Sequence, residues 1–324
     1  MTLALLAVMI EAAAGYPDAL YRAVGHPVGW IGRLIAWCDR NWNLPEYSAE
    51  ERRLRGAVTL AILLVVSLVV GFMIVRLLGW LLPGVVGLPL LALIASTLLA
   101  QRSLHQHVSA VAEALEGEGT EAGRRAVSMI VGRDTSTLDE PAICRAAIES
   151  LAENFSDGVV APLFWLVVAG LPGAIAYKAV NTADSMIGHK SEKYLAFGWA
   201  SARFDDLVNL PASRLSAVWL VLAAALSRLP VREAIDVTLR DAPKHRSPNA
   251  GWPEAAMAGA LGIRLAGPRI YGGVAGDFHW VGNGNAELGP RDIRNALALY
   301  RTACAVQIAV LALLSLAVWA VARA

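Results

Sequence analysis

Three carboxylates stand four residues apart where a polar segment passes into a hydrophobic one, in the stretch ESLAENFSDGVVAPLFW. They are Glu149, Glu153 and Asp157. Residues four apart on a helix share one face, and like charges in this arrangement destabilise the helix by roughly 0.2–0.5 kcal/mol. A divalent cation would reverse the sign of that interaction, and Mg²⁺ prefers carboxylate oxygens. The spacing leaves two interpretations open, a magnesium site or a solvated acidic face with Arg145 as one countercharge.

Further polar side chains gather in the segment YKAVNTADSMIGHKSEKY. If its first part is helical, Lys178 and Asn181 share one face, and Asp184 lies beside it. We expect Asp184 to complete the metal site, and Glu153, Asp184 and Lys190 to be the catalytic residues. Lysines next to Mg²⁺ commonly bind the phosphates of a nucleotide. A solvated helix end would have the same composition, so this segment alone does not decide between the two.

Two later segments add cationic side chains. In SARFDDLVNLPASRL, Arg203 precedes two aspartates, although a surface ion-pair cluster would look the same. In DAPKHRSP, Lys244 and His245 lie in a loop between two prolines, which is typical of an anion-binding turn or of an exposed loop. The complete set of predicted substrate and phosphate ligands is Lys178, Asn181, His189, Lys193, Arg203, Lys244 and His245.

Several other kinds of site lack support in the sequence. The stretch IYGGVAGDFHWVGNGNAELG is rich in glycine and would allow close backbone approach to a ligand. It does not contain the GxxxxGK[ST] arrangement of a P-loop, and the chain has no HExxH motif. Cys38, Cys144 and Cys304 have neither disulfide nor zinc spacing, so each is interpreted as a small core residue.

Composition predicts the elements that position these residues. The chain has 324 residues, of which 56% are hydrophobic and 17% charged, and its mean hydropathy is positive. These values are typical of an integral membrane protein. The net charge of +1 gives no reason to expect a nucleic-acid partner. We therefore predict one all-α domain over residues 1–324, a polytopic membrane protein with short re-entrant or buried helices and helical loops on the cytoplasmic side.

The apolar runs place the membrane helices. Residues 57–82, 85–100 and 303–321 are long or nearly long enough to cross the hydrocarbon core, which needs about 20 apolar residues. The shorter run over residues 1–15 contains Glu11 and has no basic start, so a short membrane helix is favoured over a signal peptide. Residues 159–170 and 216–226 are shorter still and predict buried or re-entrant helices.

Charge distribution gives an orientation. Lys and Arg number 6 over residues 15–56, 5 over 101–158, 5 over 177–215 and 9 over 230–301. By the positive-inside tendency, all four segments belong to the cytoplasmic side. This favours a re-entrant hairpin in which residues 159–170 enter the membrane and residues 174–187 return, with the breaker Leu171-Pro172-Gly173 between them.

Two helices outside the membrane are also predicted. Residues 101–130 have helical apolar spacing. The sequence Thr137-Leu138-Asp139-Glu140 matches a capping box with Thr137 as N-cap, and the helix that it begins should continue to about Phe155.

Four long motifs together resemble the CbiB/CobD family of cobalamin biosynthesis. The two central ones are RDTSTLDEPAICRAAIESLAENFSDGVVAPLFW and YKAVNTADSMIGHKSEKYLAFGWASARFDDLVNLPASR; GHPVGWIG precedes them and DAPKHRSPNAGWPEAAMAGAL follows. The resemblance covers nearly the whole chain. One departure is that Glu11 and Gly15-Tyr16-Pro17 stand where family members often have an aspartate and an Asp-Pro pair.

The resemblance implies a multi-pass protein of the cell inner membrane. It also implies a reaction, attachment of (R)-1-amino-2-propanol or its O-phosphate to a propionate of (adenosyl)cobyric acid, which gives cobinamide or its phosphate. Amide formation from a carboxylate is uphill in water, so we expect ATP and Mg²⁺ as cofactors and exclusion of water from the intermediate. Two alternatives stay open, a membrane transporter and a non-catalytic scaffold for other membrane enzymes of late cobalamin assembly.

Overall fold

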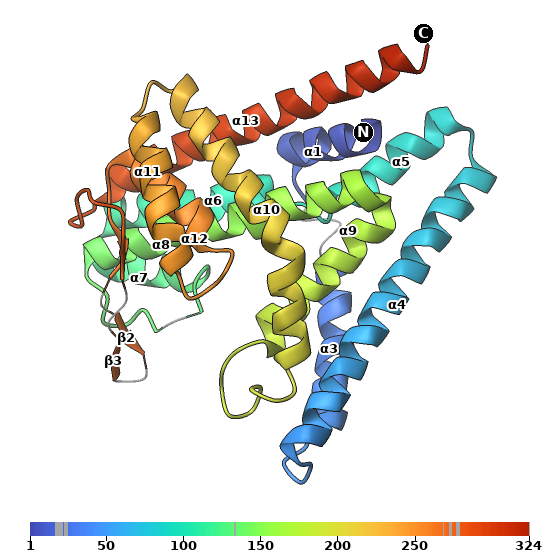
Figure 1. The fold of residues 1–324 in the computed structure, drawn as a ribbon, viewed down its shortest axis with the longest axis horizontal. Helices are drawn as coiled ribbons and strands as arrows, with labels where there is room; N and C mark the ends of the chain where they lie inside the picture. Colours follow the sequence, from blue (N-terminus) through green and yellow to red (C-terminus); the bar gives the residue numbers. More distant parts are fainter. Residues whose placement is uncertain are drawn as a thin grey trace. The chain divides into compact units, whose positions relative to one another are not determined.

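The structure is a computed structural model that describes residues 1–16, 22, 25–132, 134–267, 269–271, 274–276 and 279–323, and it is predominantly helical (Figure 1). The α-helices are α1 Thr2–Ala14, α3 Pro27–Trp42, α4 Ala49–Leu81, α5 Gly84–Ser96, α6 Gln101–Glu118, α7 Thr120–Ser128, α8 Glu140–Phe155, α9 Ala161–Ile187, α10 Trp199–Leu226, α11 Val231–Asp241, α12 Gly251–Leu261 and α13 Pro290–Val321. A π-helical turn, η1 (Ser156–Val160), joins α8 to α9, and a 3₁₀ turn, η2 (Ala242–Lys244), follows α11. The predicted all-α class is confirmed.

Within the described residues, five helical segments are long and apolar enough to cross a membrane. They are Ala49–Leu81, Gly84–Glu118, Glu140–Ile187, Trp199–Leu226 and Pro290–Val321. Two of them contain the predicted runs 85–100 and 303–321, and Ala49–Leu81 contains all of the run 57–82 except its last residue, the C-cap Leu82. α1 has 13 residues and is short, as expected. The chain is therefore a polytopic membrane protein.

A single domain was predicted. By the contacts between its residues, the chain divides into two compact units. Unit 1 comprises Met1–Ala100, Ala161–Asn209 and Leu314–Ala324, and unit 2 comprises Gln101–Val160 and Leu210–Leu313. Each unit has its own buried residues, and each contains part of the predicted site.

In unit 1, α4 lies alongside α3 and α9 (Figure 1). Ser48 caps α4 in a capping box, because its hydroxyl accepts from the Glu51 N–H and the Glu51 carboxylate accepts from the Ser48 N–H. Two glycines of α4 allow the backbone of other segments, at Phe197 and at Pro172, to pack closely against the helix. A Cβ at Gly56 would lie 1.8 Å from the Phe197 carbonyl oxygen, and one at Gly71 would lie 2.5 Å from Pro172 Cα.

A break divides α9 where the sequence predicted one. Gly170 has φ 65° and ψ −163°, which is outside the helical region, and Pro172 follows two residues later. A non-glycine residue rarely adopts such a φ, and proline has no N–H for the helical ladder. The two arms predicted over residues 159–170 and 174–187 are thus separate helical segments. Their depth in a membrane stays a prediction.

The start of α8 in unit 2 corrects one prediction. The N-cap is Asp139, whose side chain accepts from the Ala142 N–H at 2.9 Å, and Thr137 is not the cap. With Asp139 as N-cap, Pro141 falls in the first turn, where a missing N–H does no harm. A start at Thr137 would have put Pro141 further into the helix, against the Thr137 carbonyl. The predicted end near Phe155 is confirmed.

Two other predicted helices have different bounds. The helix expected over residues 101–130 is divided into α6 and α7 at Gly119, which has φ 81°. The short helix expected over residues 216–226 is the end of α10, a helix of 28 residues that begins at Trp199 and tolerates Pro211 inside it. The sequence prediction underestimated the length of α10, because the first half of the helix is polar and the apolar run begins only after it.

Four short strands in unit 2 are the main departure from helical structure. β1 (Leu265–Ala266) pairs antiparallel with β4 (Trp280–Val281), and β2 (Arg269–Tyr271) pairs antiparallel with β3 (Val274–Gly276). They lie in or beside the glycine-rich stretch. Residues 272–273 and 277–278 of that stretch lie outside the described residues.

Candidate functional site

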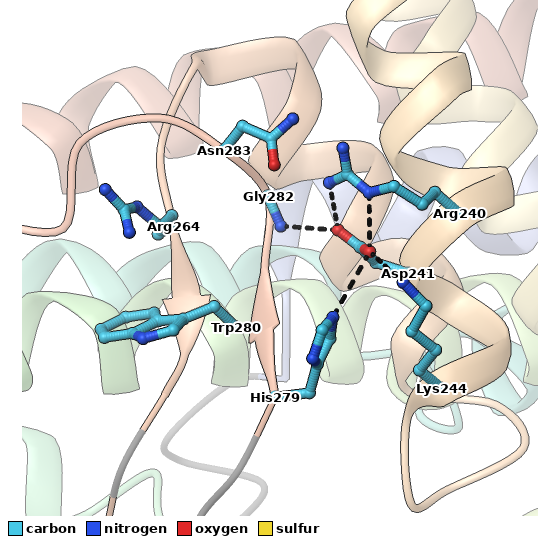
Figure 2. Close-up of a pocket in the computed structure, with 8 residues that line it drawn as sticks. All are labelled: Arg240, Asp241, Lys244, Arg264, His279, Trp280, Gly282 and Asn283. Atoms are coloured by element: carbon cyan, nitrogen blue, oxygen red, sulfur yellow. Dashed lines mark hydrogen bonds and ion pairs between the residues drawn. The ribbon is translucent and has the colours of Figure 1, made fainter.

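A pocket of about 450 Å³ surrounds the carboxylate of Asp241 in unit 2 (Figure 2). Asp241 is the last residue of α11, and it is only 1% exposed. Arg240 donates to both of its oxygens, and the Gly282 N–H donates to Oδ2 at 3.0 Å. Lys244 Nζ lies 3.3 Å from Oδ1, and His279 Nε2 lies 3.7 Å from the same atom. The pocket is lined by Arg240, Asp241, Lys244, Arg264, His279, Trp280, Gly282 and Asn283.

Local structure explains how these groups meet. Pro243 in η2 ends α11, because proline cannot continue the helical ladder, and the turn places Lys244 three residues after Asp241. The β1–β4 pair brings Gly282 from the other side. Gly282 has φ 91°, and a Cβ there would lie 2.3 Å from the Ile263 carbonyl oxygen, so only glycine fits.

The electrostatics of the pocket favour an anionic ligand. Hydrogen bonds from Arg240 hold the pKa of the Asp241 carboxyl well below its ordinary value, and Gly282 and Lys244 act in the same direction. Asp241 is therefore ionised throughout the neutral range. Against this one carboxylate the lining has three cations, and Arg240 and Lys244 are 39% and 47% exposed at the pocket surface. A phosphate or carboxylate can be bound there by charge-assisted hydrogen bonds.

Trp280 gives the pocket an aromatic side. The Arg264 guanidinium carbon lies 5.7 Å from the centre of the Trp280 ring, within the range of a cation–π contact. Figure 2 shows Arg264 and Trp280 apart from the group that converges on Asp241. The lining thus combines the charged group around Asp241 with a second side formed by Arg264 and the Trp280 ring.

Of the predicted residues in unit 2, Lys244 lines this pocket, whereas His245 is held outside the lining. His245 Nδ1 accepts from the Ser247 N–H at 3.1 Å, and His245 Nε2 lies 3.7 Å from the Glu254 carboxylate. Gly251 packs against it, because a Cβ there would lie 2.5 Å from His245 Cβ. The loop that the sequence placed between two prolines is therefore a compact turn before α12.

The three spaced carboxylates of unit 2 have different environments. Glu149 is buried, and its Oε1 accepts from the Ala266 N–H at 2.7 Å, which ties α8 to β1. Glu153 is exposed, and Asp157, in the π-helical turn, is partly buried. Arg145, the suggested countercharge, instead donates to the Ala286 carbonyl at 2.6 Å. At least Glu149 therefore has a structural role.

In unit 1 the predicted residues lie around two aspartates of α10. Asp205 is buried and accepts from Asn209 Nδ2 at 2.9 Å, and Asn181 Nδ2 lies 3.5 Å from its other oxygen. Asn209 in turn accepts from the Tyr177 hydroxyl at 2.8 Å. This network joins α9 to α10 through the neutral side chains of Asn181 and Asn209. Asp184 lies close enough to interact with Asp205 electrostatically.

The exposed cations of unit 1 are divided between two places. Arg203 pairs with Asp206 at 3.8 Å, and Lys190 also interacts electrostatically with Asp206. Lys193 instead donates to Asp39 of α3 at 2.8 Å, and this hydrogen bond raises the pKa of the Lys193 ammonium. A phosphate would have to compete with Asp39 for Lys193. His189 is exposed, and Lys178 is partly buried.

A magnesium site is not assembled by protein side chains alone in the described part of the chain. No group of three or more His, Cys, Asp or Glu residues there could hold a metal ion. Mg²⁺ commonly binds through only one or two carboxylates together with substrate phosphates, so such a site needs no larger group. The set Glu149, Glu153, Asp157 and Asp184 stays a prediction.

Sequence reasoning missed most of the pocket. Asp241, Arg240, Arg264, His279 and Trp280 were not selected, although Lys244 was. The sequence did contain one signal for the pocket. At the end of an amphipathic helix, Arg240 directly precedes Asp241, and Lys244 follows Asp241 by three residues. Nothing in the local spacing predicts that Gly282 and His279 join them.

Within the part of the chain that the structure describes, five membrane-length helical segments and a cation-lined pocket outside them define a polytopic membrane protein with a polar pocket. The family model described as CobD/Cbib protein matches residues 4–300. Two similar relatives are the cobalamin biosynthesis proteins CobD of a Sinorhizobium species, 53% identical over 93% of this chain and 94% of its own, and of Rhodobacter capsulatus, 50% identical over 98% and 97%. No solved structure matches the chain. The chain belongs to the CobD/CbiB family of cobalamin biosynthesis proteins.

Proposed function

We propose that this protein forms an amide bond in cobalamin biosynthesis, in an ATP-dependent reaction. The amine is (R)-1-amino-2-propanol or its O-phosphate, and the acid is a propionate carboxylate of (adenosyl)cobyric acid. The product is cobinamide or cobinamide phosphate, and ATP is converted to ADP and phosphate. Family membership supports the pathway, and the relatives are named for cobalamin biosynthesis.

The cationic pocket at Asp241 is the observation that favours aminopropanol O-phosphate over unphosphorylated aminopropanol as the amine substrate. Asp241 orients Arg240 and Lys244, while both remain partly exposed for a ligand. Their charges would bind the phosphate of the amine and place its nitrogen for attack. Positioning of two reactants in this way can contribute up to roughly 7–11 kcal/mol toward lowering a bimolecular barrier.

ATP would activate the carboxylate as an acyl phosphate, the usual way to make amide formation favourable. Mg²⁺, when bound, would neutralise charge on the ATP phosphates. We keep Asp184, Glu153 and Lys190 as proposed catalytic residues. Glu149, Glu153, Asp157 and Asp184 are the proposed metal ligands, of which Glu149 would have to exchange its bond to the Ala266 N–H.

The purified full chain should form a cobyric acid amide when supplied with ATP, Mg²⁺ and aminopropanol O-phosphate. We expect no product when ATP or Mg²⁺ is left out, and a slower reaction with unphosphorylated aminopropanol. Product formation is measured by mass spectrometry. A folded protein that forms no amide with either amine would refute the synthase, and corrinoid uptake by sealed vesicles without amide formation would favour a transporter. Amide formation only after other pathway enzymes are added would favour a scaffold.

We also propose that the protein lies in the cell inner membrane with its polar segments on the cytoplasmic side. Ser191→Cys in unit 1 and Arg246→Cys in unit 2 test this, because both positions are solvent-accessible outside the apolar helices. The three native cysteines are buried and give little background. An impermeant thiol reagent should label both variants in inverted vesicles and neither in intact cells. Labelling of either from outside would contradict the orientation.

A further inference from the structure

Unit 1 contains a second pocket, of about 320 Å³, at the start of α4. It is formed by the first turns of α4, the loop before α10 and the first residue of α10. The lining residues are Ala49, Glu50, Arg52, Arg53, Glu192, Leu195, Ala196 and Trp199. None of these was assigned to the proposed reaction.

The pocket lies just outside the apolar run of α4, at the level where the headgroups of a surrounding bilayer would be. The apolar run of α4 begins at residue 57, and Arg53 precedes it by four residues, or about 6 Å at 1.5 Å per residue. The headgroup layer extends roughly 5–8 Å beyond each side of the hydrocarbon core. Leu195 and Trp199 are 64% and 41% exposed, and tryptophan is enriched at this level of membrane proteins.

The charged side chains around the pocket have separate roles. Arg52 is held by the fold, because it donates to Asn43 Oδ1 at 2.7 Å and to the Lys193 carbonyl. Arg53 lies over the ring of Trp199, with its guanidinium carbon 3.6 Å from the ring centre. Among the described residues no carboxylate pairs with Arg53. Its N–H groups are thus available to a phosphate.

Two carboxylates complete the lining. Glu50 and Glu192 are exposed on α4 and on the loop before α10. Together with Arg52 and Arg53 they make the lining neutral overall, with positive and negative charges at separate positions. Such a lining matches a zwitterion better than an anion, since each charge of the ligand meets its opposite.

We infer that this pocket binds the headgroup of a phospholipid that carries a primary ammonium, of the phosphatidylethanolamine type. Arg53 binds the phosphate and is held in place by Trp199. Glu50 and Glu192 bind the ammonium, and the acyl chains run along the exposed apolar side chains that follow on α4, such as Val58 and Val65. A soluble aminoalkyl phosphate also carries an ammonium and a phosphate, but it has no acyl chains to use that surface.

The test is lipid retention by the purified full chain, measured by native mass spectrometry after reconstitution with equal amounts of phosphatidylethanolamine and phosphatidylglycerol. We expect one phosphatidylethanolamine to be retained by the native protein. Arg53→Gln should bind it about tenfold more weakly. Glu192→Gln should remove the preference over phosphatidylglycerol. Arg55→Gln is the matched control, because Arg55 lies on the same turn but stacks on Tyr47 and does not line the pocket.

Three outcomes would overturn the inference. Equal lipid retention by the native protein and by folded Arg53→Gln would show that Arg53 does not bind the phosphate. If Arg53→Gln does not fold, Glu192→Gln still tests the contact with the ammonium. Equal losses in Arg53→Gln and Arg55→Gln would indicate general attraction to the lipid surface. Displacement of the lipid by soluble phosphoethanolamine would indicate that the pocket takes a soluble aminoalkyl phosphate.

Discussion

Lys244→Gln is expected to raise the KM for aminopropanol O-phosphate about 10–100-fold, while the KM for unphosphorylated aminopropanol stays nearly constant. A hydrogen bond to a charged group contributes about 1.5–3 kcal/mol, and 1.4 kcal/mol corresponds to a factor of ten. Asp241 keeps its bonds from Arg240 and Gly282 in this variant, so the pocket should retain its shape. Steady-state kinetics with both amines measure the difference.

Arg232→Gln is the matched control for this experiment. Arg232 lies on the same helix, α11, its side chain is 95% exposed, and it pairs with Asp236 at the surface. Its removal should change neither KM. Equal losses for both amines in Lys244→Gln would contradict the phosphate assignment and would place Lys244 in ATP binding or in the structure of the loop.

Gly56→Ala is expected to destabilise unit 1 by about 3 kcal/mol, the upper end of what overpacking usually costs. The added Cβ would lie 1.8 Å from the Phe197 carbonyl oxygen, and the atom that must move belongs to backbone. The loop before α10 would be pushed away from α4. The loss is measured as a lower temperature of aggregation of the purified protein in detergent.

The control on the same helix is Gly79→Ala, where the added Cβ meets nothing within 4 Å. This change should leave the aggregation temperature unchanged or raise it, since alanine favours helix over glycine by up to about 1 kcal/mol. A Gly56→Ala protein as stable as the Gly79→Ala protein would show that the α4–loop contact relaxes without cost.

The membrane helices were predictable from the sequence because their signal is local. A run such as 57–82 needs only length and hydropathy to identify it, and α4 includes it up to Leu81. The break at Gly170 was predictable for the same reason, since proline and glycine restrict the backbone where they stand. Helix starts were less secure. Both Thr137 and Asp139 are good N-caps, and the position of Pro141 decides between them.

The pocket could not be predicted in the same way. Asp241 and Gly282 are 41 residues apart, and they meet because β1 pairs with β4, a contact that leaves no periodic pattern. Glu149 shows a second limit of local spacing. Its spacing from Glu153 suggests a ligand pair, which stays a prediction, and its hydrogen bond with the Ala266 N–H is a long-range contact that only the fold reveals. Lys193 likewise has a partner, Asp39, that lies far away in sequence.

The division into two units has a consequence for genetics. The chain passes between the units after residues 100, 160, 209 and 313, so neither unit is encoded by one uninterrupted stretch of the gene. Any nonsense mutation before codon 314 therefore removes part of both units, even when it falls in the last tenth of the reading frame. For the same reason, no single cut in the gene separates the residues of unit 1 from those of unit 2.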